Sequence, residues 1–347
     1  MKLILIAALC AATVAHAQST WKIATGYRAE SFHTENIAQF GRDVEAATKG
    51  QLRIELAPNG SLFKLGDIRQ AVEDGKVQAG ETIMTSMVKD IPIAGADAIP
   101  FVVSSYDDAK RMWDLQRPLI DKHFAQRGLK ALYAVPWPPQ GLYAGAPVRS
   151  SADFKGTRMR TYNQSTIRIA EMLGATPVDV PMVEVNKALA SGRMDNMITS
   201  AVTGVENQVW GQIKHYYDIN AWFPKNIVFV NLKAFDTLKP AVQQAVLKSA
   251  QEAETRGWAM SRGVAADSTG ELKAKGMKVD RMFFQKFEDT VKAHPVVAQQ
   301  VSDGQWDQAI EFISTELFDK PNEYFNLDKL RCAAGVDRRL GLREILE

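Results

Sequence analysis

Five segments of alternating type follow one another near the start of the chain, and this order constrains the fold more than any other feature. Strand patterns lie at residues 21–25, 52–56 and 77–83, with helix patterns between them at 33–49 and 66–74. The first helix pattern carries Ile37, Phe40 and Val44 at helical spacing. A β-α-β-α-β order predicts an α/β fold with an open, largely parallel sheet covered by helices.

A second region, residues 155–195, repeats the alternation and adds charge. It reads as a short strand carrying Arg158 and Arg160, a helix that ends near Gly174, a turn through Pro177, and a second helix that ends at Gly192. Side chains alternate along a strand, so the two arginines are expected on one face. A guanidinium on such a strand could pair with a carboxylate through two parallel hydrogen bonds.

A long helical pattern covers residues 238–275. One uninterrupted helix of that length would extend roughly 50 Å, more than the width of a small domain. The alternative is two helices broken at Gly257 or Gly263. The sequence alone leaves both interpretations open.

The first 17 residues have the pattern of a secretory signal peptide. Lys2 precedes an apolar run at 3–14, and Ala15-His16-Ala17 forms a cleavage box. The run is shorter than the roughly 20 residues that span a bilayer. Cleavage would leave Cys332 as the only cysteine, which excludes a disulfide framework. We therefore expect an exported protein that is located in the periplasm.

Composition narrows the classes of function. A chain of 347 residues predicts two domains. The formal charge is +2, and near +1 once Lys2 is removed with the signal peptide, so a nucleic-acid partner is not expected. The common nucleophile, metalloprotease, P-loop and dinucleotide motifs are absent. The four histidines that follow the signal peptide show no metal-ligand spacing: His33, His123, His215 and His294.

An ordered set of short motifs carries a resemblance to a known family. In residues 155–195 the set is Lys155-Gly156, Arg160, Leu173-Gly174-Ala175, Pro177, Glu184-Val185, Ala188-Leu189, Gly192 and Asp195. Nearer the start it is Thr48-x-Gly50, Pro58-Asn59-Gly60-Ser61-Leu62, Gly75-Lys76-Val77 and Ile99-Pro100-Phe101. Together these motifs resemble the DctP-like solute-binding subunits of tripartite ATP-independent periplasmic (TRAP) transporters.

This resemblance implies a two-domain periplasmic-binding-protein-like fold. Its mixed, mostly parallel sheets would enclose a ligand cleft between the domains, and one long helix would span both. The expected parts are a signal peptide at 1–17, a first domain at 18–138 plus 225–264, a second domain at 139–224 plus 265–325, and a peripheral tail at 326–347.

The resemblance also implies a function. The protein would capture an organic acid by hinge closure and deliver it to the TRAP membrane permease subunits, as a monomer or weak dimer. No enzymatic step, cofactor or resident metal is expected. The ligand is expected to be a monocarboxylate, either aromatic or a small hydroxy or oxo acid.

By the same resemblance, the family's carboxylate-binding arginine falls on Arg160. Thr199 occupies the place of an asparagine amide that often assists this arginine, and Met182 replaces an aromatic wall. Tyr143 stands where sialic-acid-binding members carry a second arginine, which favours a ligand with one carboxylate. A tyrosine there can pack its ring and donate a hydrogen bond.

Four further residues are candidates for the ligand site, each with a structural alternative. Tyr27 follows the first strand, and Glu81 lies near the end of a later strand, where ligands commonly enter α/β folds. Trp137 and Trp222 lie in the segments expected to cross between the domains. The aromatic residues are otherwise core residues, and Glu81 is otherwise the partner of a basic side chain.

Other functions remain open from the sequence. An exported enzyme could use the same two-lobed scaffold. A calcium ion could bridge the ligand to acidic residues such as Glu81 or Asp195. The ligand could also be presented to a sensory receptor rather than to a permease.

Overall fold

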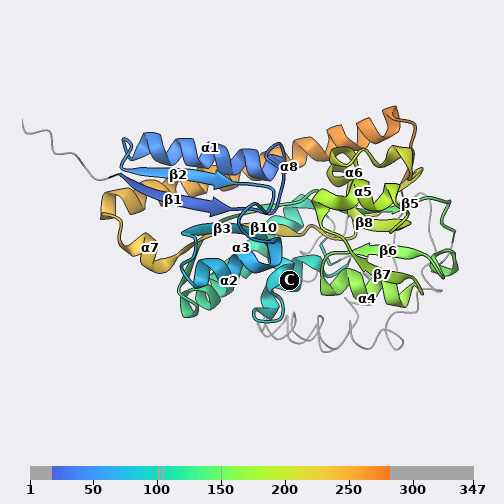
Figure 1. Cartoon of the computed structure of the whole chain (residues 1–347), viewed down its shortest axis with the longest axis horizontal. Coiled ribbons are helices and arrows are strands. Elements are labelled where there is room, and N and C mark those ends of the chain that lie inside the picture. The colour runs from blue at the N-terminus through green and yellow to red at the C-terminus, as the bar shows by residue number, and fades with distance from the viewer. Residues whose placement is uncertain (1–17, 101, 104, 150, 282–347) are drawn as a thin grey trace, which may run out of the picture.

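The computed structural model describes residues 18–100, 102–103, 105–149 and 151–281, which form two β-sheets arranged along the long axis of the molecule (Figure 1). The first sheet has the strand order β2-β1-β3-β10-β4: β1 Ser19–Ala24, β2 Leu52–Ala57, β3 Ala79–Ile83, β4 Leu129–Pro136 and β10 Lys225–Asn231. The second has the order β11-β9-β5-β8-β6-β7: β5 Gln140–Ala144, β6 Arg158–Thr161, β7 Thr176–Asp179, β8 Asn196–Ser200, β9 His215–Asp218 and β11 Lys278–Arg281. We call each sheet, with the helices packed on it, the first and the second domain.

Helices connect the strands and cover the sheets. The α-helices are α1 Phe32–Ala47, α2 Ile68–Glu73, α3 Tyr106–Gln126, α4 Gln164–Met172, α5 Val185–Ala190, α6 Ala201–Glu206, α7 Leu232–Asp236 and α8 Pro240–Ala274. The 3₁₀ helices are η1 Leu65–Asp67, η2 Met84–Met87, η3 Pro92–Ala98, η4 Ser151–Phe154, η5 Met182–Glu184 and η6 Val209–Gly211. Within the described residues, no helix is both long enough and apolar enough to cross a membrane.

The first sheet is covered on both faces. Val228 and Val230 of β10 pack with α1 and α8, whereas the alternate residues Ile227 and Phe229 pack with α2 and α3. This two-sided burial explains why β10 is apolar without alternation. The predicted order of strands and helices over residues 21–83 is confirmed, with β1 parallel to both β2 and β3.

Both sheets are mixed because the chain crosses between them. β10 runs antiparallel to β3 and β4, and β5 runs antiparallel to β8 and β9. The two crossing segments, 137–139 and 219–224, are joined by backbone hydrogen bonds. The amide of Trp137 donates to the carbonyl of Pro224 (2.7 Å), and that of Gln140 donates to the carbonyl of Trp222 (2.9 Å). The hinge is therefore a two-stranded ribbon rather than two independent linkers.

A third connection is the 35-residue helix α8, which continues past Gly257 and Gly263 without a break. It packs on α1 and β4 of the first domain and on α6 and β11 of the second, and Figure 1 shows it extending across both. The predicted continuous helix is confirmed, and the alternative of two broken helices is wrong.

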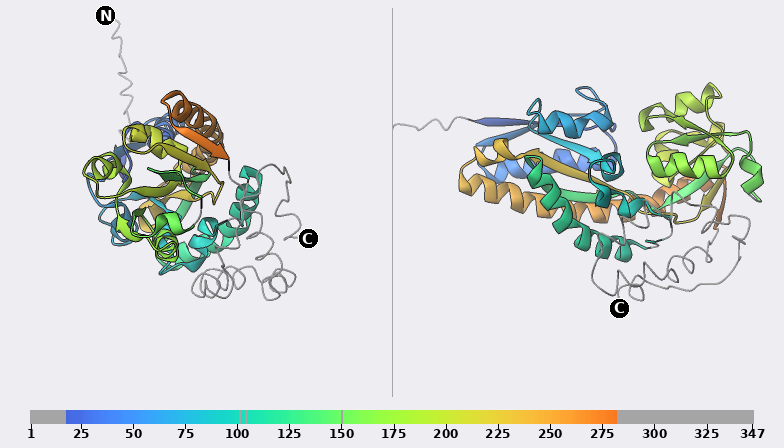
Figure 2. Two further views of the ribbon diagram at one scale, coloured as in Figure 1. Left: turned by 90° about the vertical axis from the view of Figure 1, so that its right-hand side faces the viewer. Right: turned by 90° about the horizontal axis from the view of Figure 1, so that it is seen from below.

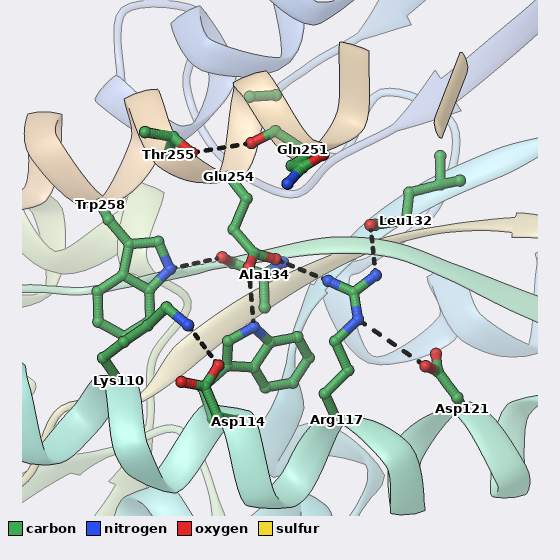
Figure 3. A network of polar contacts seen from close by, with 12 residues as sticks. Lys110, Asp114, Arg117, Asp121, Leu132, Ala134, Gln251, Glu254, Thr255 and Trp258 are labelled. Carbon is green, nitrogen blue, oxygen red and sulfur yellow. Dashed lines mark hydrogen bonds and ion pairs between the residues drawn. The ribbon is translucent and has the colours of Figure 1, made fainter. Parts of the chain in front are cut away.

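The carboxylate of Glu254 fixes α8 to the first domain (Figure 3). It accepts hydrogen bonds from Trp113 Nε1 (3.2 Å), Arg117 Nη1 (2.9 Å) and the backbone amide of Ala134 (3.0 Å). One turn further on, Trp258 Nε1 donates to the carbonyl of Ala134 (3.0 Å). The backbone amide and carbonyl of Ala134 in β4 are thus both hydrogen-bonded to side chains of α8.

One local prediction is wrong. Pro177 does not form a turn but lies inside β7, opposite Met159 of β6. β7 is the last strand of its sheet, where a residue without an N–H is tolerated. The expected signal peptide, the second domain beyond residue 281 and the expected tail lie outside the described residues. The domain boundaries therefore stay a prediction.

Candidate ligand-binding site

Arg160 lies near the carboxyl end of β6, at the edge of the second sheet that faces the first domain. Only 4% of the residue is exposed. Its Nε donates to the carbonyl of Val180 (2.9 Å), and its guanidinium carbon lies 5.0 Å from the ring centre of Tyr162. It makes no ion pair with any described residue. Burial lowers the pKa of Arg160, with Tyr162, Tyr27 and Asp179 acting in the opposite direction. A buried cation without a carboxylate partner is costly, so an anionic ligand would lower its free energy.

Arg158, two residues earlier, has a different environment. Its Nε and Nη2 donate to the two carboxylate oxygens of Asp195, at 2.9 and 2.7 Å, on the protein surface. This pair raises the pKa of Arg158 and lowers the pKa of Asp195. Arg158 is therefore a structural ion-pair partner.

Across the domain boundary, a buried polar network lies at the ends of β1 and β3. Asn226 Oδ1 accepts from Trp137 Nε1 (2.9 Å) and from the Tyr27 hydroxyl (3.3 Å). Its Nδ2 donates to Glu81 Oε1 (2.9 Å), and the Thr25 hydroxyl donates to Glu81 Oε2 (2.5 Å). Tyr27, Trp137 and Glu81 therefore belong to one cluster, which Asn226 holds together. No motif in the sequence distinguishes Asn226.

His33 completes this network and was not among the predicted site residues. Its Nδ1 lies 3.5 Å from Glu81 Oε1, and its ring lies against Trp137, with the ring centres 4.4 Å apart. Burial lowers the pKa of His33 well below its ordinary value, so the ring is neutral. Burial raises the pKa of Glu81 to about 7, although hydrogen bonds from Thr25 and Asn226 act in the opposite direction. No signal beyond its place after the first strand distinguishes His33 in the sequence.

Tyr162 connects Arg160 to the first domain. Its ring carries the Arg160 guanidinium, and it packs against the apolar cluster that contains Tyr27 and Trp137. Its hydroxyl donates to Gln140 Oε1 (3.2 Å), and burial raises its pKa to about 12. Its position two residues after Arg160 is the signal that could have identified it, since side chains alternate along a strand.

Three further predicted residues are Met182, Thr199 and Trp222, and each has different surroundings. Met182 packs against the same cluster as Tyr162, so it is brought to the domain boundary. Thr199 is buried near the carboxyl end of β8, where its hydroxyl donates to Thr203 Oγ1 (3.0 Å). Trp222 is buried in the crossing segment. Its Nε1 lies close to the Tyr162 hydroxyl and lowers the pKa of that group.

Tyr143 does not lie at the domain boundary. It pairs with Met197, two residues further into the sheet than Thr199, and is completely buried under α6. Its hydroxyl donates to the carbonyls of Ser200 (3.1 Å) and Ala201 (3.3 Å). This tyrosine packs in the core of the second domain, and its predicted place in the ligand site stays a prediction.

Arg28 bridges the two domains directly. It follows β1 and donates to three acceptors of the second domain: Glu206 O (2.9 Å), Val183 O (3.0 Å) and Asn207 Oδ1 (3.1 Å). These bonds exist only while the domains are together. In the described part of the chain, no three His, Cys, Asp or Glu side chains are grouped as metal ligands.

Two α/β domains, a paired hinge, and facing cationic and polar surfaces define a bilobed solute-binding protein. The chain belongs to the DctP family, described as bacterial extracellular solute-binding protein, family 7, whose model matches residues 23–302. The family predicted from the sequence motifs is therefore confirmed, as are the two-domain fold and the TRAP solute-binding class.

Several solved and curated proteins are similar to the chain. DctP6 of Bordetella pertussis, a receptor with bound pyroglutamic acid, is 36% identical with a TM-score of 0.78, covering 84% of this chain and 98% of its own. A pyroglutamate-specific TRAP protein from a marine metagenome is 35% identical with a TM-score of 0.75, covering 87% and 96%. The 2,3-diketo-L-gulonate-binding protein YiaO of Escherichia coli is 28% identical over 242 residues, covering 66% of this chain and 71% of its own.

Proposed function

We propose that this protein captures pyroglutamate, a cyclic monocarboxylate, between its two domains and delivers it to the membrane subunits of a TRAP transporter. The observation that carries the proposal is Arg160, a buried guanidinium with no carboxylate partner among the described residues. The choice of ligand is supported by the pyroglutamate bound in relatives that are 35–37% identical to this chain.

In this proposal Arg160 binds the carboxylate, and Tyr162, Tyr27, Trp137 and Met182 surround the ring. Thr199 assists Arg160 from the neighbouring strand. Glu81 is connected to Tyr27 through Asn226, which hydrogen-bonds to both. Contacts to both domains make the closed arrangement more stable than the open one when ligand is present. The protein acts in the periplasm as a monomer or weak dimer after removal of residues 1–17, and it returns its ligand unchanged.

Calorimetric titration of the mature protein tests the ligand and its anchor. The protein is first unfolded and refolded to remove carried-over ligand, then titrated with pyroglutamate, galacturonate and glucuronate, each with calcium or with a chelator. We expect pyroglutamate to bind most tightly, independently of calcium. Mass spectrometry of the recovered ligand should show no chemical change.

Arg160→Ala should weaken pyroglutamate binding by at least ~100-fold, because truncating one partner of a buried, hydrogen-bonded charge pair is strongly unfavourable. Without ligand, the variant should melt at or above the wild-type temperature, since Arg160 has no ion pair to lose. The matched control is Arg158→Ala, which removes an arginine from the same strand and should change affinity less than about threefold, as expected for an exposed ion pair. Equal effects of the two variants would refute the role of Arg160.

A further inference from the structure

Lys225 and Asp97 form a buried charged pair near the domain boundary. Neither residue has a part in the ligand site as proposed so far. Lys225 begins β10 directly after the crossing segment, and Asp97 lies near the end of η3. Lys225 Nζ is 3.1 Å from Asp97 Oδ2, and the backbone amide of Lys225 donates to the same oxygen (2.8 Å). The two side chains are 0% and 1% exposed, which is unusual for residues of either type.

The pair leaves hydrogen-bonding capacity unused. Among the described residues, Asp97 Oδ1 has no hydrogen-bond partner, and Lys225 Nζ contacts Asp97 Oδ2 but has no other acceptor for its remaining N–H groups. Unsatisfied groups of this kind are rare in protein interiors, and one acceptor and one donor side by side form a complementary edge for a ligand.

The position of the pair relates it to Arg160. Ala98, next to Asp97, packs in the apolar cluster of the second domain together with Trp222. Tyr162, whose ring carries the Arg160 guanidinium, is close enough to Asp97 for the carboxylate to raise the pKa of its hydroxyl. Asp97 therefore lies near the domain boundary, within electrostatic range of the Tyr162 hydroxyl.

We infer that Asp97 and Lys225 recognise the lactam of the bound acid, with Asp97 Oδ1 accepting from the ring N–H and Lys225 Nζ donating to the ring carbonyl. This inference rests on the proposed function. A lactam is a cis amide, so its donor and acceptor lie on one edge, which matches one acceptor and one donor side by side. In pyroglutamate the carboxylate, N–H and carbonyl follow one another around the ring. Arg160 and the pair would bind successive groups of one small molecule.

The inference predicts a specific preference in the wild-type protein. Cyclopentanecarboxylate keeps the ring and the carboxylate but has neither lactam group, so it would leave both charged side chains unpaired in a closed site. A site built to hydrogen-bond a polar group rejects an analogue that lacks it far more strongly than an apolar pocket does. We expect cyclopentanecarboxylate to bind at least ~100-fold more weakly than pyroglutamate.

Three variants test the residues: Lys225→Met, Asp97→Asn and the double variant Asp97→Asn/Lys225→Met. Methionine and asparagine keep the side-chain volumes, and replacing both charges leaves no lone buried charge in the double variant. The readout is the ratio of the two dissociation constants, measured by calorimetry. In the double variant we expect the dissociation constants of cyclopentanecarboxylate and pyroglutamate to differ by less than about tenfold. The matched control, Arg158→Met, removes a charge from the surface pair with Asp195 and should leave the ratio unchanged.

The outcomes separate this inference from the proposed function. Wild-type protein that does not bind pyroglutamate would refute the proposed function. Wild-type protein that binds both acids equally would overturn the inference alone, without any variant. The inference would also be overturned if the wild type prefers pyroglutamate but the folded variants keep the same ratio of the two dissociation constants. Arg160→Ala should weaken both acids together, because both carry the carboxylate.

Discussion

At the scale of single residues, burial changes the ionisation of Glu81 in the proposed site. It is 1% exposed and accepts hydrogen bonds from Thr25 and Asn226, beside a neutral His33. Burial outweighs these hydrogen bonds and raises the pKa of Glu81 from 4.5 to about 7. The charged form is therefore the less stable one in the folded protein at mildly acid pH.

This shift predicts how stability varies with pH. The folded protein holds the Glu81 proton more tightly than the unfolded chain, so the resulting stability is complete below pH 4.5 and is lost as the pH rises to about 7. The loss should be of order 3 kcal/mol. Glu206 has a pKa raised to about 7 as well, so the wild-type curve contains both groups. Subtracting the curve of Glu81→Gln isolates Glu81.

Chemical denaturation of both ligand-free proteins between pH 4 and pH 8 would measure the difference. The wild type should lose more unfolding free energy over this range than Glu81→Gln does. Parallel curves would mean that Glu81 has the same pKa in the folded and unfolded states, so that its hydrogen bonds offset its burial.

The two arginines of β6 show how far the sequence predicts individual side chains. Strand alternation places Arg158 and Arg160 on one face, and the family motif distinguishes Arg160. The partner of Arg158, Asp195, lies 37 residues away, and only the fold identifies it. Asn226, His33 and Lys225 were not predicted, because their environments are created by strands and helices far apart in the sequence.

At the scale of secondary structure, α8 shows a conflict between local propensity and packing. Glycine inside a helix costs about 1 kcal/mol relative to alanine, which is why the sequence left a break at Gly257 or Gly263 open. The structure gives Gly257 a reason: a Cβ atom there would lie 2.3 Å from Val135 Cγ2 and 2.7 Å from Asn36 Nδ2. The helix needs this glycine in order to approach β4 and α1 closely. Gly263 has nothing within 4 Å of such an atom.

Replacement by alanine should therefore have opposite effects on stability at Gly257 and at Gly263. Gly257→Ala should destabilise the protein by about 1–3 kcal/mol, because the helix must move away from β4. Gly263→Ala should stabilise it by about 0.5–1 kcal/mol through helix propensity alone. Denaturant midpoints of both variants measure the contrast. Stabilisation by Gly257→Ala would contradict the close approach of α8 to β4.

At the scale of the whole molecule, Arg28 of the first domain makes three hydrogen bonds to the second domain. The three acceptors of Arg28 all belong to the second domain, and two of them are backbone carbonyls. Its hydrogen bonds therefore contribute to the free-energy difference between closed and open arrangements rather than to the stability of either domain. Figure 2 shows from below how the two domains meet along the hinge and the long helix.

Arg28→Ala should accordingly weaken ligand binding by about 10–100-fold, mainly through faster dissociation, without lowering the melting temperature of the ligand-free protein. Stopped-flow measurement of dissociation, together with small-angle X-ray scattering with and without ligand, checks both parts. Arg42→Ala is the control, because Arg42 binds only Gln39 on the surface of α1. Unchanged dissociation would show that closure does not depend on Arg28.

The continuity of α8 has a consequence for how such receptors diverge. The helix is bound to the first domain through Glu254 and reaches the second domain with Leu272, so any opening of the domains must bend it or loosen its packing. Substitutions along its length can change the energy of opening without touching the ligand. Selection can then adjust binding strength to the nutrient concentration of a habitat while the choice of nutrient stays the same.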